Sequence, residues 1–271
     1  VLADLREGVV LGQHQRLVPA RTEPGEHAAY PCLVDQHGGR LLGQRPFGGV
    51  QHQVEHAHAH RGDAATYDGV EGFWRFVTGL DRPLDVACLN VGIGIGGAFA
   101  DTDLDDFEWV LDVNLRAPVR LIHALLPLLR ESRPAWIVNV SSLYGIVAPP
   151  GQTAYCASKF GLRGFSESLR HELSGSGTGL TLVHPGGVAT AIARNARLPR
   201  GADPVQAERG RAAHERFLKL APETAAAEIL RAVERGAPRA LVGSDARLVS
   251  LLQRLMPVGY WSLLGRLARQ G

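Results

Sequence analysis

From Asp63 to the end of the chain, short apolar runs alternate with segments of helical periodicity. Buried strands are predicted at residues 84–91 (LDVACLNV), 136–140 (WIVNV) and 180–184 (LTLVH), with a shorter strand at 240–242. Helices are predicted over residues 103–131, 153–173, 222–235 and 245–255. Strands that alternate with helices in this way are typical of βαβ units. The sequence therefore predicts an α/β domain with a doubly wound parallel sheet, whose ligand binds beyond the carboxyl ends of the strands.

Residues 1–62 lack this regular alternation. They hold seven of the eleven histidines and few sustained apolar runs. We therefore expect an anomalous amino-terminal segment (1–62), either irregular or a non-native-like Rossmann start, ahead of the catalytic part of a single domain (63–271). His52, His56 and His60 have the i, i+4 spacing with which a helix can build a metal site. A short histidine-rich tract is a compositional signal only, and we therefore predict no metal.

Composition excludes several classes of protein. The 29 basic and 27 acidic side chains are spread along the 271 residues, which leaves no concentrated positive field for nucleic acid. No apolar run reaches the ~18 residues that a membrane-spanning helix needs. The three cysteines, Cys32, Cys88 and Cys156, are odd in number and lack metal-ligand spacing, which favours a reducing compartment. Since the opening residues also lack the apolar core of a secretory signal, we expect a cytoplasmic protein.

A glycine-rich stretch follows the predicted strand at 84–91. Asn90-Val91-Gly92 stands at the strand's end, where a glycine lets the backbone approach a ligand closely. Gly92, Gly94 and Gly97 also match the G-x-G-x-x-G pattern of dinucleotide-binding turns. Such a turn opens directly onto a helix, whereas residues 99–102 separate these glycines from the next predicted helix. We therefore do not interpret them as the pyrophosphate-binding turn.

Asn114 lies inside the long helical pattern, four residues before Pro118. Because proline has no N–H, the Asn114 carbonyl loses its usual i+4 donor and the helix is expected to bend there. A buried carbonyl without that donor needs another partner, such as an ordered water. Taken alone, the pattern favours a solvated asparagine in mid-helix with a tolerated proline.

Ser141-Ser142 and Tyr155-Cys156-Ala157-Ser158-Lys159 follow the strand at 136–140. On a helix, Tyr155 and Lys159 lie on one face, where the ammonium can favour the phenolate. An unperturbed tyrosine titrates near pH ~10 and needs such help to act as an acid or base. Only two lysines, Lys159 and Lys219, occur among the 29 basic residues. In a chain that otherwise uses arginine, a lysine at this position indicates a specific role for it.

These elements together resemble the short-chain dehydrogenase/reductase family. The resemblance covers about Asp63 to the carboxyl terminus and rests on five elements: Asn90-Val91-Gly92, Asn114, Ser142 thirteen residues before Tyr155, the Tyr155-x-x-x-Lys159 pair, and Pro185-Gly186-Gly187-Val188-Ala189-Thr190. It implies a Rossmann-like fold, a homo-oligomer, a nicotinamide cofactor (NAD or NADP) and a small carbonyl or alcohol substrate.

The resemblance also implies a role for each matching residue. Tyr155 would be the general acid/base, Ser142 would orient the substrate oxygen, and Lys159 would bind the nicotinamide ribose and lower the Tyr155 pKa. Asn114 would hold a relay water through its main chain. The implied cofactor contacts are Asp63 near the adenine, together with Asn90, Gly92, Tyr155, Lys159, Pro185, Gly186, Val188 and Thr190. Residues 191–220 would form much of the substrate wall.

One family element is missing from this sequence. The Thr-Gly-x-x-x-Gly-x-Gly turn, which binds the pyrophosphate, should lie some forty to fifty residues before Asp63, and no such pattern occurs there. A second hypothesis is therefore a cofactor-free relic or binding protein that keeps the site residues, and a third is a metal-binding module built on the amino-terminal histidines. The residue that selects NAD or NADP cannot be identified.

The carboxyl-terminal segment, residues 247–269, combines Leu, Met, Trp and Tyr with spaced Arg, as interfacial membrane helices do. Pro257 and Gly259 divide it into two short helices. That division favours packing on the domain or on a subunit partner over membrane contact.

Overall fold

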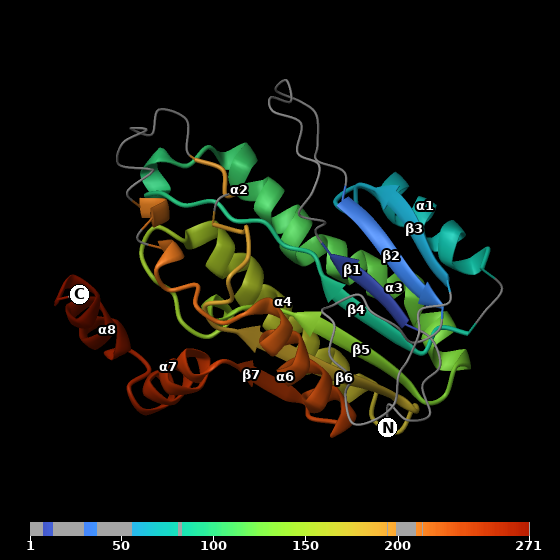
Figure 1. Ribbon diagram of the computed structural model, residues 1–271. Helices are drawn as coiled ribbons and strands as arrows, with labels where there is room; N and C mark the ends of the chain where they lie inside the picture. The colour runs from blue at the N-terminus through green and yellow to red at the C-terminus, as the bar shows by residue number, and fades with distance from the viewer. Residues whose placement is uncertain are drawn as a thin grey trace.

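The computed structural model describes residues 8–12, 30–36, 56–80, 83–193, 195–198, 210–212 and 214–270. They form a seven-stranded sheet in the order β3-β2-β1-β4-β5-β6-β7 (Figure 1). β1 (Gly8–Gly12), β4 (Val86–Asn90), β5 (Ala135–Val140), β6 (Thr178–Pro185) and β7 (Arg239–Val242) are parallel, each to its neighbour. The predicted doubly wound parallel sheet is confirmed for this part of the fold.

The described part of residues 1–62 contributes three strands to the sheet. β1 lies beside β4 in the position of a central Rossmann strand. β2 (Tyr30–Gln36) is antiparallel to both β1 and β3 (His56–Gly62), so the sheet is not wholly parallel. The apolar runs in β1 and β2 are only three residues long, Val9–Leu11 and Cys32–Val34, which is why periodicity did not distinguish them from loops.

The histidine-rich tract is extended and not helical. His56 and His60 both belong to β3, so the i, i+4 interpretation of their spacing is wrong, while His52 lies outside the described residues. Within the described residues, no group of three or more His, Cys, Asp or Glu side chains is placed to hold a metal ion.

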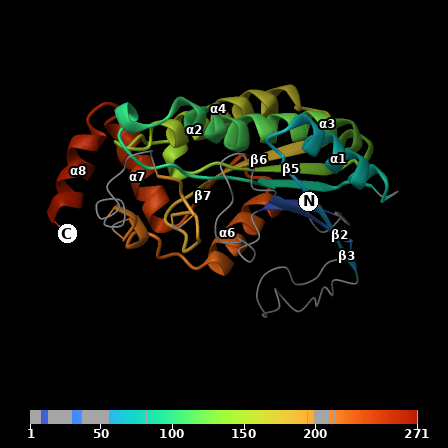
Figure 2. The same ribbon diagram turned by 90° about the horizontal axis from the view of Figure 1, so that it is seen from above.

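Helices cover both faces of the sheet, as Figure 2 shows from above. One face carries α1 (Tyr67–Thr78), α2 (Leu104–Leu111), α3 (Ala117–Glu131) and α4 (Thr153–Glu172), and the other carries α6 (Pro222–Glu234). Along β4, Ala87 and Leu89 join the core beneath α1 to α4, whereas Val86 and Cys88 pack on the α6 side. This alternation is what a strand buried on both faces requires.

The helix and strand boundaries from β4 onward lie within a few residues of those predicted. The long pattern at 103–131 is interrupted, since a π-helical turn at Asp112–Arg116 joins α2 to α3. At the carboxyl end, α7 (Ser244–Leu255) and α8 (Tyr260–Gln270) are separated at Pro257 and Gly259, as predicted. Across the part of the chain that is described, no helix is long and apolar enough to span a bilayer.

The sheet brings distant parts of the sequence to one edge. β3, β4, β5 and β6 all run in the same direction, so their carboxyl ends meet at that edge. The residues that follow these ends are Asp63, Val91, Ser141 and Gly186, which begin the segments singled out in the sequence. This edge is where a doubly wound sheet binds its ligand.

Candidate active site

Tyr155 and Lys159 occupy successive turns on the buried face of α4. The Lys159 Nζ lies 5.8 Å from the centre of the Tyr155 ring. The side chains are 9% and 3% exposed, respectively, so both polar groups are almost removed from solvent. The predicted juxtaposition on one helical face is therefore present.

Three consecutive residues at the end of β5 hold α4 and its side chains in place. The Val140 carbonyl accepts a hydrogen bond from Lys159 Nζ at 3.1 Å, and the Ser141 hydroxyl donates to the Lys159 carbonyl at 3.0 Å. The side chain of Ser142 interacts with the Tyr155 phenol and lowers its pKa. Ser142 also accepts from the Tyr144 amide at 3.1 Å, which fixes the rotamer of its hydroxyl.

Gly145 permits this close contact between β5 and α4. It lies in a short 3₁₀ turn, Leu143–Gly145. A Cβ at this position would stand 2.5 Å from Ser141 Oγ and 2.8 Å from the Lys159 carbonyl oxygen. Both distances are far inside van der Waals contact, so only glycine fits.

Asn114 lies in the π-helical turn and is fully buried. Its Oδ1 accepts from the Ile93 amide at 2.8 Å, and its Nδ2 donates to the Ile93 carbonyl at 2.9 Å and to Ser158 Oγ at 3.1 Å. Ser158 in turn donates to the Tyr155 carbonyl at 2.7 Å. The side chain thus joins the segment after β4 to α4, and the solvated mid-helix alternative is wrong. Residues in π-helical turns are frequently functional.

Burial shifts the pKa values of both Tyr155 and Lys159. Burial raises the pKa of Tyr155 to about 12, and the side chain of Ser142 offsets this only in part. Burial also lowers the pKa of Lys159 to about 8, because an ammonium loses its hydration there. Burial is therefore the dominant cause of the Tyr155 shift, and Lys159 is not among its causes. That Lys159 lowers the Tyr155 pKa stays a prediction. Tyr155 is a protonated phenol at neutral pH.

His184, which the sequence did not single out, supports Ser142 from the neighbouring strand. It is fully buried on β6, and its Nδ1 lies 2.8 Å from the Ser142 carbonyl oxygen. Because a carbonyl only accepts, Nδ1 carries the proton. Burial lowers the pKa of His184 to about 4, so the ring is neutral. No hydrogen-bond partner for its Nε2 is found among the described residues.

The residues after β4 and β6 line the same edge. A Cβ on Gly92 would come within 3.2 Å of Lys159 Nζ, so the glycine leaves room directly beside the ammonium. Asn90 is the exposed last residue of β4. Gly94 and Gly97 lie in the loop after β4, a 3₁₀ turn at Phe99–Asp101 follows, and α2 begins at Leu104.

Pro185 ends β6, and the segment after it is fixed by backbone hydrogen bonds. Gly186 donates to the Val242 carbonyl at 2.9 Å, and Thr190 donates to the Val188 carbonyl at 2.8 Å. Gly187 donates to Asp245 Oδ2 at 2.7 Å. This segment therefore leaves the sheet at the carboxyl ends of β6 and β7.

The candidate substrate wall, residues 191–220, is described only in part. Its described portion pairs with the loop after β4 through Ile95 and Arg197. Further along, the ring of His214 lies 6.2 Å from that of Tyr144, which itself packs edge-on against Tyr155 at 6.0 Å. Tyr144 and His214 escaped the sequence analysis because no motif marks them.

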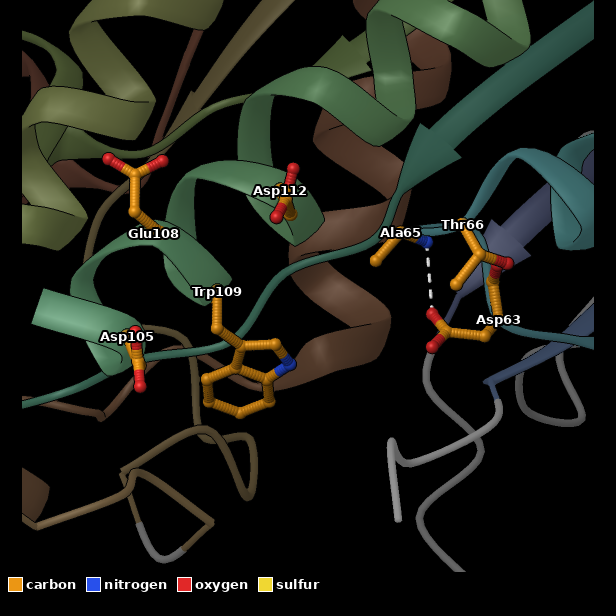
Figure 3. A pocket seen from close by; sticks show the side chains of 7 residues that line it. All are labelled: Asp63, Ala65, Thr66, Asp105, Glu108, Trp109 and Asp112. Atoms are coloured by element: carbon orange, nitrogen blue, oxygen red, sulfur yellow. Dashed lines mark hydrogen bonds between the residues drawn. The ribbon is translucent and has the colours of Figure 1, made fainter. Parts of the chain in front are cut away.

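Asp63 lies directly after β3, and its Oδ1 accepts a hydrogen bond from the Ala65 amide at 2.9 Å. Figure 3 shows it at one side of a depression whose other wall is α2. Four carboxylates and one indole line the depression: Asp63, Asp105, Glu108, Asp112 and Trp109. Glu108 and Asp112 are ion-paired with Arg116 at 2.9 and 3.0 Å.

Comparison with known proteins agrees with this arrangement. The family model described as short chain dehydrogenase matches residues 47–201, which begins earlier than the Asp63 boundary of the sequence resemblance. A putative oxidoreductase, SadH, of Mycobacterium tuberculosis (strain ATCC 25618 / H37Rv) is 39% identical over 177 residues, which is 65% of this chain and 63% of the relative. The chain therefore matches less than two thirds of that relative's length.

Two solved structures share the fold. A short chain dehydrogenase/reductase from Burkholderia phymatum in complex with NAD has a TM-score of 0.66 at 24% identity, covering 72% of this chain and 74% of that one. A short chain dehydrogenase from Burkholderia cenocepacia J2315 in complex with NADP has a TM-score of 0.59 at 22% identity, covering 76% of each chain. With the family model matched over more than half of its residues, this chain belongs to the short chain dehydrogenase family.

Proposed function

We propose that the protein is an NAD(P)-dependent oxidoreductase that interconverts a carbonyl and a secondary alcohol, with Tyr155 as the general acid/base. One observation carries the proposal. A buried phenol lies beside the serine at the end of β5, which lowers its pKa, with an ammonium one helical turn away. A family member with this triad has the groups needed to move a proton to or from a substrate oxygen.

The residues fit a nicotinamide cofactor at the ribose end. The Lys159 ammonium has three donors, and the described residues account for one of them, at Val140. Gly92 leaves space beside the ammonium, which a side chain would fill. Family members of known structure have NAD or NADP bound, which supports the same choice here without deciding between the two.

When bound, the cofactor supplies or accepts the hydride. Tyr155 Oη, a protonated phenol at neutral pH, donates its proton to the substrate oxygen in the direction of reduction. The Ser142 hydroxyl orients that oxygen, and the donors of Lys159 hold the ribose. Asn114, whose side chain is committed to Ile93 and Ser158, keeps its main chain for a relay water in this proposal.

The remaining contacts follow from the sheet edge. Asn90 and Gly92 after β4, and Pro185, Gly186, Val188 and Thr190 at the end of β6, line the cofactor in this proposal. Asp63 takes the adenine, since a carboxylate can accept a hydrogen bond from its amino group.

A second function is favoured by the sequence that follows β1. The family's pyrophosphate turn belongs at this point, yet residues 13–29 contain a single glycine, Gly25. A chain that cannot hold the pyrophosphate would be a cofactor-free relic. Titration of the purified protein with NADH and NADPH, followed by nicotinamide fluorescence, separates the two, because saturable binding eliminates the relic.

The enzyme proposal is tested by Tyr155→Phe. We expect the variant to bind cofactor with unchanged affinity and to lose turnover on a panel of ketones and alcohols. Tyr67→Phe, at a tyrosine that is 75% exposed on α1, is the matched control and should keep full activity. Normal turnover by Tyr155→Phe would refute the assigned role.

A further inference from the structure

The last two helices carry an apolar surface that the domain does not cover. Leu248, Leu251 and Leu255 of α7 are 68%, 55% and 71% exposed, and Val258 in the following turn is 93% exposed. Met256 beside it and Leu263 of α8 are also exposed. These side chains do not pack on the domain, and packing on a subunit partner, the other part of the expectation, stays a prediction.

The exposed leucines form one continuous stripe. At ~100° per residue, Leu248, Leu251 and Leu255 fall within one narrow sector of the α7 surface. Ala246, which is fully buried, falls on the opposite side. The helix is thus held to the domain by one face and presents an apolar stripe to solvent on the other.

A hydrogen bond to the rest of the domain fixes the position of α8, the second of the two helices. Tyr260, the first residue of α8, accepts a hydrogen bond through its hydroxyl from the Ala148 amide at 2.9 Å. Figure 1 shows α7 and α8 at the end of the molecule remote from β2 and β3. The exposed turn at Met256–Val258 lies between the two helices.

The charge of this segment has one sign. Residues 246–270 contain four arginines and no Asp or Glu. Arg247 is paired with Glu228 at 2.7 Å, whereas Arg254 is exposed and has no ion pair among the described residues. The nearest acid in sequence, Asp245, is already bonded to the Gly187 amide.

We propose that α7, α8 and the turn between them bind the surface of an anionic lipid bilayer. Asp245, in the first turn of α7, is the one carboxylate of the two helices. Beyond it, apolar side chains on one helical face with arginines beside them are the features with which a helix lies in the headgroup region. Leu248, Leu251, Leu255 and Val258 enter the acyl boundary, and Arg254 meets the lipid phosphates.

The same features disfavour a second copy of the chain as the occupant. A two-fold contact would place this surface against itself, so arginines would face arginines with no carboxylate from the same segment to neutralise them. An anionic bilayer supplies the missing charge.

Co-sedimentation with vesicles tests the proposal on the full chain. Vesicles of phosphatidylcholine with about a third phosphatidylglycerol should bind the protein, and vesicles of phosphatidylcholine alone should bind at least about tenfold less. Binding should weaken when the salt rises from ~0.15 M to ~1 M, because the Debye length falls from ~8 Å to ~3 Å.

The triple variant Leu248→Ser, Leu251→Ser, Leu255→Ser should lose at least about tenfold in partitioning, since all three side chains leave the acyl boundary. Leu104→Ser with Leu230→Ser, at exposed leucines on α2 and α6, is the control and should bind as the parent does. Circular dichroism melts check that each variant folds.

Three results would overturn the proposal. One is failure of the parent protein to sediment with anionic vesicles, and another is unchanged sedimentation of the triple variant. In the third, the parent does not bind vesicles, and light scattering shows a smaller assembly for the triple variant than for the parent. That result would mean that the stripe binds a second copy of the chain. None of these outcomes depends on the proposed enzymatic activity.

Discussion

We expect Lys159 to lower the free energy of unfolding, because its charged ammonium is buried for a function in the site. Burial lowers the pKa of its ammonium from 10.5 to about 8, a difference that corresponds to about 3 kcal/mol against folding at neutral pH. Lys159→Met removes the buried charge at nearly constant volume. It also removes the hydrogen bond to the Val140 carbonyl, worth about 1 kcal/mol. We therefore expect the variant to be more stable than the parent by about 2 kcal/mol at neutral pH, and to lose cofactor binding.

The effect should depend on pH with a defined sign. Below pH 8 the ammonium is charged in both the folded and the unfolded chain, so the parent carries the whole penalty. Between about 8 and 10.5 the folded state releases its proton first, and the stability of the parent rises with pH. The advantage of Lys159→Met should therefore shrink across this range and disappear near its upper end.

Urea denaturation of both proteins at neutral pH and at pH ~10 measures this difference. Lys219, the second lysine, is exposed near the end of the candidate substrate wall, so Lys219→Met is the matched control and should change stability by less than ~0.5 kcal/mol. The reasoning fails if Lys159→Met is less stable than the parent at neutral pH by an amount that does not change with pH.

Three further variants probe the supports of the site. The pKa of His184 is about 4 in the fold against 6.5 ordinarily, so the parent should lose stability as pH falls from about 6.5 to 4, and His184→Gln should lose that dependence in urea titrations. Asn114→Ala should lower the free energy of unfolding by about 2 to 4 kcal/mol, because it leaves a buried N–H and C=O of Ile93 without partners; a loss below ~0.5 kcal/mol would contradict this. Gly145→Ala, whose Cβ would stand 2.5 Å from a buried hydroxyl oxygen, should abolish turnover, whereas Gly164→Ala, with nothing within 4 Å, should keep it in the same assay.

Periodicity predicted the fold from β4 onward because each strand there is mostly apolar and lies between helices on both faces of the sheet. The Tyr155 and Lys159 juxtaposition followed from helix geometry alone, since residues four apart share a face. In the same way, the separation of α7 from α8 followed from Pro257 and Gly259.

Other features depend on tertiary structure and left no local pattern. β2 takes its direction from pairing with β1 and β3, and three apolar residues could not reveal it. The side chain of Asn114 finds its partners 21 and 44 residues away, and His184 reaches Ser142 across 42 residues, so neither role is visible in a window of sequence. The direction in which the Tyr155 pKa shifts depends on how deeply its side chain is buried. The sequence spacing of Tyr155 and Lys159 carries no information on that burial.

The presence of only two lysines gives the protein a built-in chemical reporter. An acylating reagent attacks neutral amines, and with its pKa at about 8 the Lys159 amine has an appreciable neutral fraction near physiological pH, although it is buried. Lys219 is exposed and reacts as an internal reference. A dinucleotide seated against Lys159 would shield it while leaving Lys219 open. The ratio of the two modified peptides in a mass spectrum would then measure occupancy of the site in a mixture, with no knowledge of the substrate.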